Sequence, residues 1–211
     1  MRARDIMTAP VITVRPATTI KEAAALLAGH GFTALPVLDD DHRLIGIVTE
    51  ADLVRDRVPR DPRALIHPGH RPVPGPVTTT VGEVMTTPAV AMGPGTDVAV
   101  LAKALLDAGH RSMPIVEGST VVGIVTRRDI VRAIARDDDT IAADVRHRLE
   151  IYGSDRRWQV EVQDGVVSIA DQFDSHQPNA ETDRHVATVL AEAVPGVVRA
   201  TAFAARAEDD R

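Results

Sequence analysis

Gly46-Ile47-Val48-Thr49-Glu50-Ala51-Asp52 is the stretch that decides the fold, because it returns later as Gly123-Ile124-Val125-Thr126-Arg127-Arg128-Asp129. In each copy a β-branched pair, typical of a buried strand, stands before a Thr. An Asp follows that Thr three residues later. We therefore expect a strand that ends at the Thr and turns directly into a helix.

The Thr-x-x-Asp spacing has two interpretations. It fits a capping box, in which Thr caps the helix and the acid accepts from the backbone N–H of the cap residue. It also fits a ligand site, because a helix N-terminus attracts phosphate. There the Thr hydroxyl would contact the phosphate and the carboxylate would accept from ribose hydroxyls. Spacing alone favours the cap, since such boxes are common.

The whole neighbourhood of the motif is repeated. Asp5-Ile6-Met7-Thr8-Ala9-Pro10 corresponds to Glu83-Val84-Met85-Thr86-Thr87-Pro88, and Leu35-Pro36-Val37 corresponds to Met113-Pro114-Ile115, both at an offset of 78 positions. A repeat of this length is one supersecondary unit, and two such units are expected to share a core.

Each repeat is expected to have the order β-α-β-β-α. The elements are a short strand, a helix, a hairpin and a second helix. In the first repeat the strand is 11–14, the helix starts near 18–19, the hairpin is 34–38 with 44–48, and the last helix follows Thr49. In the second repeat the strand is 89–92, the helix starts near 96–97, the hairpin is 112–116 with 121–125, and the last helix follows Thr126.

Composition and charge exclude several classes of protein. The chain of 211 residues has no Cys, which removes disulfides and thiolate chemistry, and no apolar run long enough to span a bilayer. The net charge of −6 is uneven: residues 1–136 hold 16 basic and 14 acidic side chains, and residues 137–211 hold 8 and 16. We expect a cytoplasmic protein that binds neither nucleic acid nor an anionic membrane.

The repeated motifs resemble the CBS (cystathionine β-synthase) domain. Residues 1–57 and 81–136 would be two CBS repeats forming a tandem pair, or Bateman module, with a Pro-rich linker at 58–80. The resemblance implies a pseudo-twofold α+β pair whose cleft binds AMP, ADP, ATP or S-adenosylmethionine, with no required cofactor and no metal. Such modules commonly form homodimers through their helices and act as sensors.

The resemblance also implies which residues touch the ligand. Thr49 and Thr126 would contact phosphate, and Asp52 and Asp129 would hold the ribose. The remaining candidates comprise two residues flanking the base, Ile12 and Val90, and three phosphate partners, His110, Arg111 and Arg127.

The two repeats differ in charge at equivalent positions. The second has Arg111 and Arg127 where the first has Thr33 and Glu50. We therefore expect the second cleft to bind nucleotide more tightly. An exposed helix face explains Arg127 and Arg128 equally well.

The last third starts with three acids at 137–139 and has its own pattern. Ile141, Val145 and Leu149 form one helical stripe, and 158–163 alternates as a strand. Asp164-Gly165 predicts a two-residue hairpin into 166–169. A helix from about Ala180 should bury Val186, Val189, Leu190 and Ala193, and a last strand covers 198–203.

This α-β-β-α-β order resembles the BON domain, named from bacterial osmotic-response and nodulation proteins. The resemblance covers 137–205, leaving 206–211 as a charged tail. It implies phospholipid or protein contacts, and the acidic charge favours protein. We expect this domain to fold separately.

Two functions from different classes compete. The first is a regulatory sensor whose CBS pair binds an adenosine compound and whose BON domain is the interaction or output module. The alternative is a structural adaptor with non-functional clefts. An enzyme is not expected, since the chain has no Walker A loop, no defensible Ser-His-Asp order and no clustered metal ligands.

Overall fold

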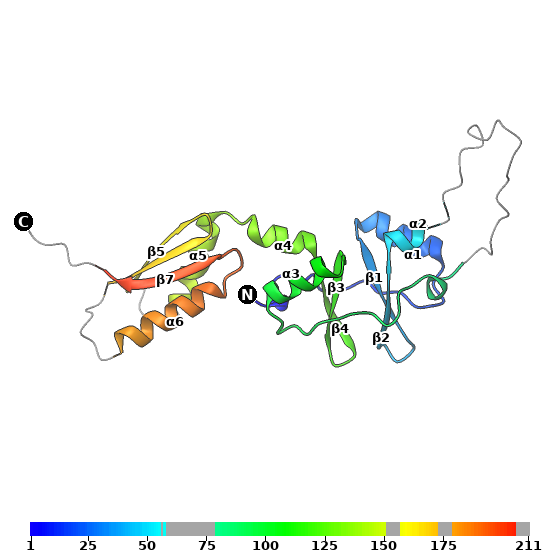
Figure 1. Cartoon of the computed structure of the whole chain (residues 1–211), viewed down its shortest axis with the longest axis horizontal. Coiled ribbons are helices and arrows are strands. Elements are labelled where there is room, and N and C mark those ends of the chain that lie inside the picture. Colours follow the sequence, from blue (N-terminus) through cyan, green and yellow to red (C-terminus); the bar gives the residue numbers. More distant parts are fainter. Residues whose placement is uncertain (56, 58–78, 151–156, 173–178, 206–211) are drawn as a thin grey trace, which may run out of the picture. The chain divides into compact units, whose positions relative to one another are not determined.

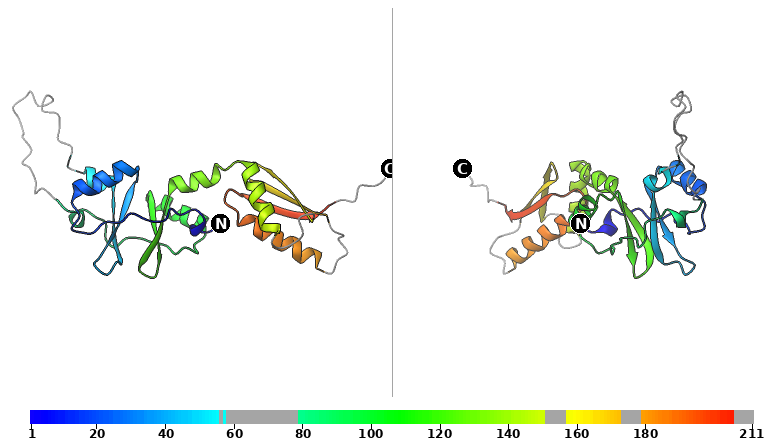
Figure 2. Two further views of the ribbon diagram at one scale, coloured as in Figure 1. Left: turned by 180° about the vertical axis from the view of Figure 1, so that it is seen from behind. Right: turned by 45° about the vertical axis from the view of Figure 1, so that its right-hand side comes forward.

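The computed structural model describes residues 1–55, 57, 79–150, 157–172 and 179–205. Its elements form two compact units, which are described separately (Figures 1 and 2). The expected linker lies outside the described residues except for Thr79 and Thr80, as does the charged tail. We call Met7–Thr96 with Leu101–Thr126 the hairpin unit, and Met1–Ile6, Asp97–Val100 and Arg127–Arg211 the three-stranded unit.

The hairpin unit contains both predicted β-hairpins. Strands β1 and β2 are antiparallel, as are β3 and β4, which confirms this part of the prediction. The elements are α1 (Ile20–His30), β1 (Ala34–Leu38), β2 (Leu44–Thr49), α2 (Glu50–Val54), η3 (Val81–Glu83), the part of α3 (Val98–Asp107) from Leu101 onward, β3 (Ser112–Glu117) and β4 (Thr120–Thr126).

The two expected first strands, 11–14 and 89–92, are not formed as strands. Each reduces to a single bridge, in which the Val14 amide donates to the Pro36 carbonyl at 3.0 Å and the Met92 amide to Pro114 at 3.1 Å. The next ladder bond would need an N–H from the same proline, and proline has none. The Leu-Pro-Val pattern therefore ends the pairing that hydropathy alone predicted.

The segments that precede the first helix of each repeat, 7–14 and 85–92, are the leaders of the two repeats. Each leader pairs with the hairpin of the other repeat. Thr8 exchanges two backbone hydrogen bonds with Ile124 (2.9 and 3.1 Å), and Thr86 does the same with Ile47 (2.9 and 3.0 Å). Neither repeat is complete without the other.

A second contact fixes the same exchange. Met7 packs on Gly123, where an added Cβ would overlap the Met7 sulfur. Met85 packs on Gly46 in the same way, with the Met85 sulfur at 2.8 Å from the corresponding point. Gly in the repeated motif thus provides the space that a methionine from the other repeat fills.

The core of the hairpin unit is aliphatic. Leu35, Val37 and Val48 from the first hairpin are fully buried against Ile20 and Leu27 of α1. The buried residues of this helix, Ile20, Ala23 and Leu27, recur at helical spacing, as an amphipathic helix requires.

Two capping boxes of this unit hold their acids ionised. Thr19 with Glu22 starts α1, and Thr80 with Glu83 starts η3. Hydrogen bonds from the Thr80 and Thr79 amides hold the pKa of Glu83 below its usual 4.5, and the Thr19 amide and hydroxyl do the same for Glu22.

A pH dependence of stability follows from the lowered pKa of Glu83. A depressed folded-state pKa contributes stability above the unfolded pKa, and this is lost as pH falls through the folded value. We expect the stability difference between wild type and Glu83→Gln to be largest near neutral pH and to shrink below about pH 4. Urea unfolding of both proteins across pH 7 to 3 measures it, and a difference that grows toward acid would contradict the assignment.

The three-stranded unit has the α-β-β-α-β order predicted for residues 137–205. Strand β6 lies between β5, to which it is antiparallel, and β7, to which it is parallel through the α6 crossover. The elements are η1 (Ala3–Asp5), the first residues of α3, α4 (Arg127–Ile134), α5 (Asp138–Glu150), β5 (Trp158–Gln163), β6 (Val166–Asp171), α6 (Ala180–Glu192) and β7 (Arg199–Ala204).

The β5–β6 turn is the predicted two-residue hairpin. Asp164 and Gly165 both have positive φ, 50° and 73°, as a type I′ turn requires. The side chain of Asp138, at the start of α5, accepts from both amides at 2.8 and 2.9 Å. One of the three acids before α5 therefore ties the helix to the hairpin.

Helices α5 and α6 cover the same face of this sheet (Figure 2). The α5 stripe of Ile141, Val145 and Leu149 is fully buried, as predicted. The face predicted for α6 is correct only in part, because Leu190 packs against the core whereas Val189 is 51% exposed. The buried residues of α6 are alanines, which let the helix approach α5 and the sheet closely; they are Ala180, Ala187 and Ala191.

Helix α4 groups with this unit, although the sequence places it in the second repeat. Arg136, just after α4, donates to Asp144 at 2.6 Å and to the Pro195 carbonyl at 2.9 Å. Gly196 allows a close approach, since an added Cβ would lie 3.1 Å from the Ala133 carbonyl. Among the described residues, no helix is long and apolar enough to cross a membrane.

Candidate functional site

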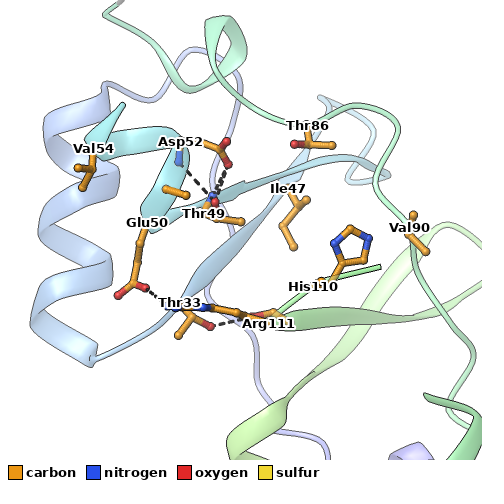
Figure 3. A pocket seen from close by; sticks show the side chains of 13 residues that line it. Thr33, Ile47, Thr49, Glu50, Asp52, Val54, Thr86, Val90, His110 and Arg111 are labelled. Carbon is orange, nitrogen blue, oxygen red and sulfur yellow. Dashed lines mark hydrogen bonds and ion pairs between the residues drawn. The ribbon is translucent and has the colours of Figure 1, made fainter. Parts of the chain in front are cut away.

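A cavity of about 570 Å³ opens in the hairpin unit, at the end of the first hairpin (Figure 3). Its size lies within the range of small-molecule sites. Residues from both repeats line it, and polar groups are interspersed with apolar ones. The lining comprises Thr33, Ile47, Thr49, Glu50, Ala51, Asp52, Val54, Thr86, Val90, Gly109, His110, Arg111 and Ser112.

Thr49 and Asp52 form the capping box at the start of α2. Oδ2 of Asp52 accepts from the Thr49 amide at 2.9 Å and from its hydroxyl at 2.7 Å, and the Asp52 amide donates back to Oγ1 at 3.4 Å. The acceptor atoms of these three hydrogen bonds are Asp52 Oδ2 and Thr49 Oγ1, and none of the three involves Asp52 Oδ1. The cap therefore fixes the carboxylate on the pocket wall and leaves Oδ1 for another donor, so the two interpretations of the motif are compatible.

The two hairpins meet at the pocket. Thr33 and Ser112, at the starts of β1 and β3, share a hydroxyl–hydroxyl hydrogen bond of 2.7 Å. Because β1 starts beside the end of β2, this contact brings the residues before β3 next to the residues after β2. As a result Arg111 Nη1 lies 3.3 Å from Glu50 Oε2, across the lower edge of the pocket in Figure 3.

Five of the nine residues predicted from the sequence lie together in this cavity. They are Thr49, Asp52, Val90, His110 and Arg111.

The other four predicted residues lie elsewhere. Ile12 is half-buried against the core of the hairpin unit. Thr126 ends β4 in the same unit. Arg127 and Asp129 belong to α4 in the three-stranded unit, where the buried Asp129 pairs with Arg132 at 3.2 Å.

Arg111 belongs to the second repeat but lies beside the motif of the first repeat. Arg111 faces Glu50 and shares a pocket with Thr49 and Asp52, so it supplies positive charge to the first motif. One of the two arginines behind the ranking of the second cleft, Arg111, thus lies at the first motif, and the ranking itself stays a prediction. Sequence reasoning also missed Glu50 as a pocket residue, because the charge comparison treated each repeat as a separate site.

Comparison with known proteins identifies the two repeats. Residues 3–58 and residues 81–136 each match the model of the CBS domain family. The chain belongs to the CBS domain family. Both matches end before the three-stranded unit's sheet begins, so the BON resemblance of residues 137–205 stays a prediction.

Curated CBS relatives share this part of the chain. An uncharacterised 17.7 kDa protein of Acidianus ambivalens is 30% identical over 134 residues, which cover 63% of this chain and 73% of that protein. The chloroplastic CBS domain-containing protein CBSX1 of Arabidopsis thaliana is 30% identical over 135 residues, 57% of each chain. An A-adding tRNA nucleotidyltransferase of Geobacter sulfurreducens is 31% identical, but the match covers only 13% of it.

Two solved CBS structures resemble the chain and hold ligands. The CBS domain pair of protein MJ0100, in complex with 5-methylthioadenosine and S-adenosyl-L-methionine, is 28% identical with a TM-score of 0.50. CBSX2 of Arabidopsis thaliana in complex with AMP is 30% identical with a TM-score of 0.51. Each match covers 63% of this chain and 94% of the other.

Proposed function

We propose that this protein is a regulatory ligand sensor that binds an adenosine compound in the pocket between its two hairpins. The observation that carries the proposal is the convergence of Thr49, Asp52 and Arg111 on one cavity of ligand size. The two similar CBS pairs that hold AMP or S-adenosylmethionine with 5-methylthioadenosine support the same ligand class.

Each polar group has a role that suits such a ligand. Oδ1 of Asp52 accepts from ribose hydroxyls, because Oδ2 is engaged in the cap. The base packs between Ile47 and Val90, an apolar pair on the pocket wall. Arg111, whose side chain is 72% exposed, reaches the 5′ substituent. No group in this arrangement acts as a nucleophile, and we propose binding without catalysis.

The output of the sensor is the second part of the proposal. The three-stranded unit acts as the interaction module, with its acidic surface turned to a protein partner. The chain forms a homodimer through the CBS helices, which expose apolar side chains such as Val54 (59%) and Leu106 (63%). A cytoplasmic location belongs to the same proposal.

Replacing Asp52 with asparagine tests the site. We expect affinity for AMP and for 5-methylthioadenosine to fall about tenfold, the effect of losing a hydrogen bond to a charged group. Isothermal titration calorimetry measures the affinities. A thermal-shift series checks that ligand stabilises the folded chain as ligand concentration rises.

Glu22→Gln is the matched control. It weakens the same kind of capping box, Thr19 with Glu22, at a site outside the pocket. We expect its ligand affinities to equal those of wild type. If no adenosine compound binds the wild-type chain, the sensor proposal fails and the adaptor function takes its place.

A further inference from the structure

Glu50 stands out among the pocket residues because its charge opposes the anion that Arg111 attracts. Both side chains line the cavity, and they form an ion pair of 3.3 Å along its lower edge. With Asp52, the wall carries two carboxylates against one guanidinium. A site selected for the largest possible number of phosphates would not place a carboxylate beside its arginine.

The ion pair is weak enough to rearrange. Glu50 is 50% exposed and Arg111 is 72% exposed, and pairs in such positions contribute little to stability. A single phosphate therefore replaces Glu50 on Arg111 at small cost. The backbone of Glu50 is held at the edge of the pocket by the hydrogen bond from its amide to the Thr33 carbonyl, at 3.3 Å, so the carboxylate stays within reach of the cavity when it leaves Arg111.

We propose that Glu50 determines specificity by the charge of the 5′ substituent. This inference rests on the proposed function of the pocket and deepens it. One phosphate is neutralised by Arg111, whereas each further phosphate meets the Glu50 carboxylate without a second guanidinium among the lining residues. A cationic 5′ group instead gains from Glu50. The pocket thus disfavours nucleoside triphosphates and accepts nucleosides with an uncharged, cationic or monophosphate 5′ group.

The test uses four ligands that share adenosine and differ in 5′ charge. S-adenosylmethionine is a net cation, 5-methylthioadenosine is uncharged, AMP has one phosphate and ATP has three. Calorimetry on the full chain at pH 8, where imidazoles are mostly neutral, compares wild type with Glu50→Gln. Glu117→Gln is the control, because it removes an exposed carboxylate of the same unit outside the pocket lining.

In Glu50→Gln we expect ATP affinity to rise about fivefold and S-adenosylmethionine affinity to fall by a similar factor, the size of one exposed charge interaction. Affinity for uncharged 5-methylthioadenosine should stay the same. Both changes should shrink in high salt, since they act between partly exposed charges. Glu117→Gln should leave all four affinities unchanged.

Two results would overturn the inference in distinguishable ways. If the four ligands bind but Glu50→Gln changes them all equally, the pocket is a nucleoside site and Glu50 does not select charge. If none of the four binds wild type, the proposed function fails and the inference fails with it. If the substitution disturbed the folded structure of the pocket, the affinity for 5-methylthioadenosine would fall as well. That result is distinguishable from the expected pattern, in which this affinity is unchanged.

Discussion

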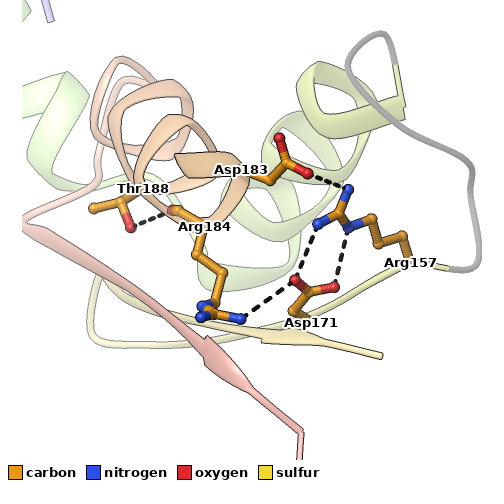
Figure 4. A network of polar contacts seen from close by, with 5 residues as sticks. All are labelled: Arg157, Asp171, Asp183, Arg184 and Thr188. Atoms are coloured by element: carbon orange, nitrogen blue, oxygen red, sulfur yellow. Dashed lines mark hydrogen bonds and ion pairs between the residues drawn. The ribbon is translucent and has the colours of Figure 1, made fainter. Parts of the chain in front are cut away.

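Replacing Asp171 with alanine is expected to lower the free energy of unfolding by about 3–5 kcal/mol, the typical cost of removing one partner of a buried ion pair. Asp171 ends β6 and is 1% exposed. Its two oxygens accept from Nε and Nη2 of Arg157 at 3.0 and 3.1 Å, a bidentate arrangement (Figure 4). Arg157 is itself buried, so the substitution leaves a guanidinium without its main counter-charge.

The surrounding charges explain why the loss is large. Asp183 on α6 also accepts from Arg157, at 2.8 Å, and Arg184 lies 3.8 Å from Asp171. These contacts, with Asp171 first, raise the pKa of Arg157, so the guanidinium does not escape by losing its proton. Without Asp171, Arg157 keeps the hydrogen bond to Asp183 but loses its bidentate partner, and Arg184 loses the contact with Asp171.

Chemical denaturation of the wild-type chain, Asp171→Ala and two further variants measures the free energies of unfolding. Asp171→Asn keeps the side-chain volume but removes the charge. It should lower the free energy of unfolding nearly as much as Asp171→Ala does, which would identify the charge as the cause. Asp183→Ala should cost less, because this side chain is 22% exposed and makes one of the bonds. A loss under about 1 kcal/mol for Asp171→Asn, the value typical of an exposed pair, would contradict this account.

Replacing Gly46 with alanine is expected to cost about 3 kcal/mol, the upper range for overpacking a well-filled core. The new Cβ would lie 2.9 Å from the Thr86 carbonyl oxygen and 2.8 Å from the Met85 sulfur. The sulfur is at the flexible part of a side chain, but the carbonyl belongs to backbone that is hydrogen-bonded to Ile47 at both of its polar groups. The backbone cannot withdraw without breaking that pair.

The second repeat provides the control. At Gly123 all three nearest atoms belong to the Met7 side chain, which is able to move or to be shortened. We expect Met7→Ala to rescue Gly123→Ala and Met85→Ala to rescue Gly46→Ala only in part. A double-mutant cycle by urea unfolding measures both couplings. Full rescue of Gly46→Ala by Met85→Ala would show that the Thr86 contact is not the obstacle.

Much of the fold follows from local signals in the sequence. The two hairpins, the capping box at Thr49, the Asp164-Gly165 turn and the stripe of α5 were all predictable, because each depends on residues close in the chain. The predicted first strands failed for a local reason as well. A proline in the partner strand removes the donor that a longer ladder needs.

The arrangement of the site and the packing of α6 depend on contacts that local signals do not show. Arg111 joins Thr49 because the hairpins of the two repeats meet through Thr33 and Ser112, a contact between residues far apart in the chain. Val189 was predicted to be buried because it is the more hydrophobic residue, whereas the structure buries the smaller Ala187, which packs closely against the core. The family resemblance named five residues that line the cavity, without showing that they come together from both repeats.

The exchange of leaders has a consequence for how this chain tolerates genetic change. A side chain added at position 46 or 123 meets a methionine of the opposite repeat, Met85 or Met7, so a change in one half acts on the packing of the other. Yet both contacts use the same pair of residue types, methionine against glycine. Recombination that exchanged one hairpin for the other would still place a methionine opposite each glycine. The packing contacts between the repeats are thus interchangeable, whereas charged positions such as Glu50 and Arg127 differ between the repeats.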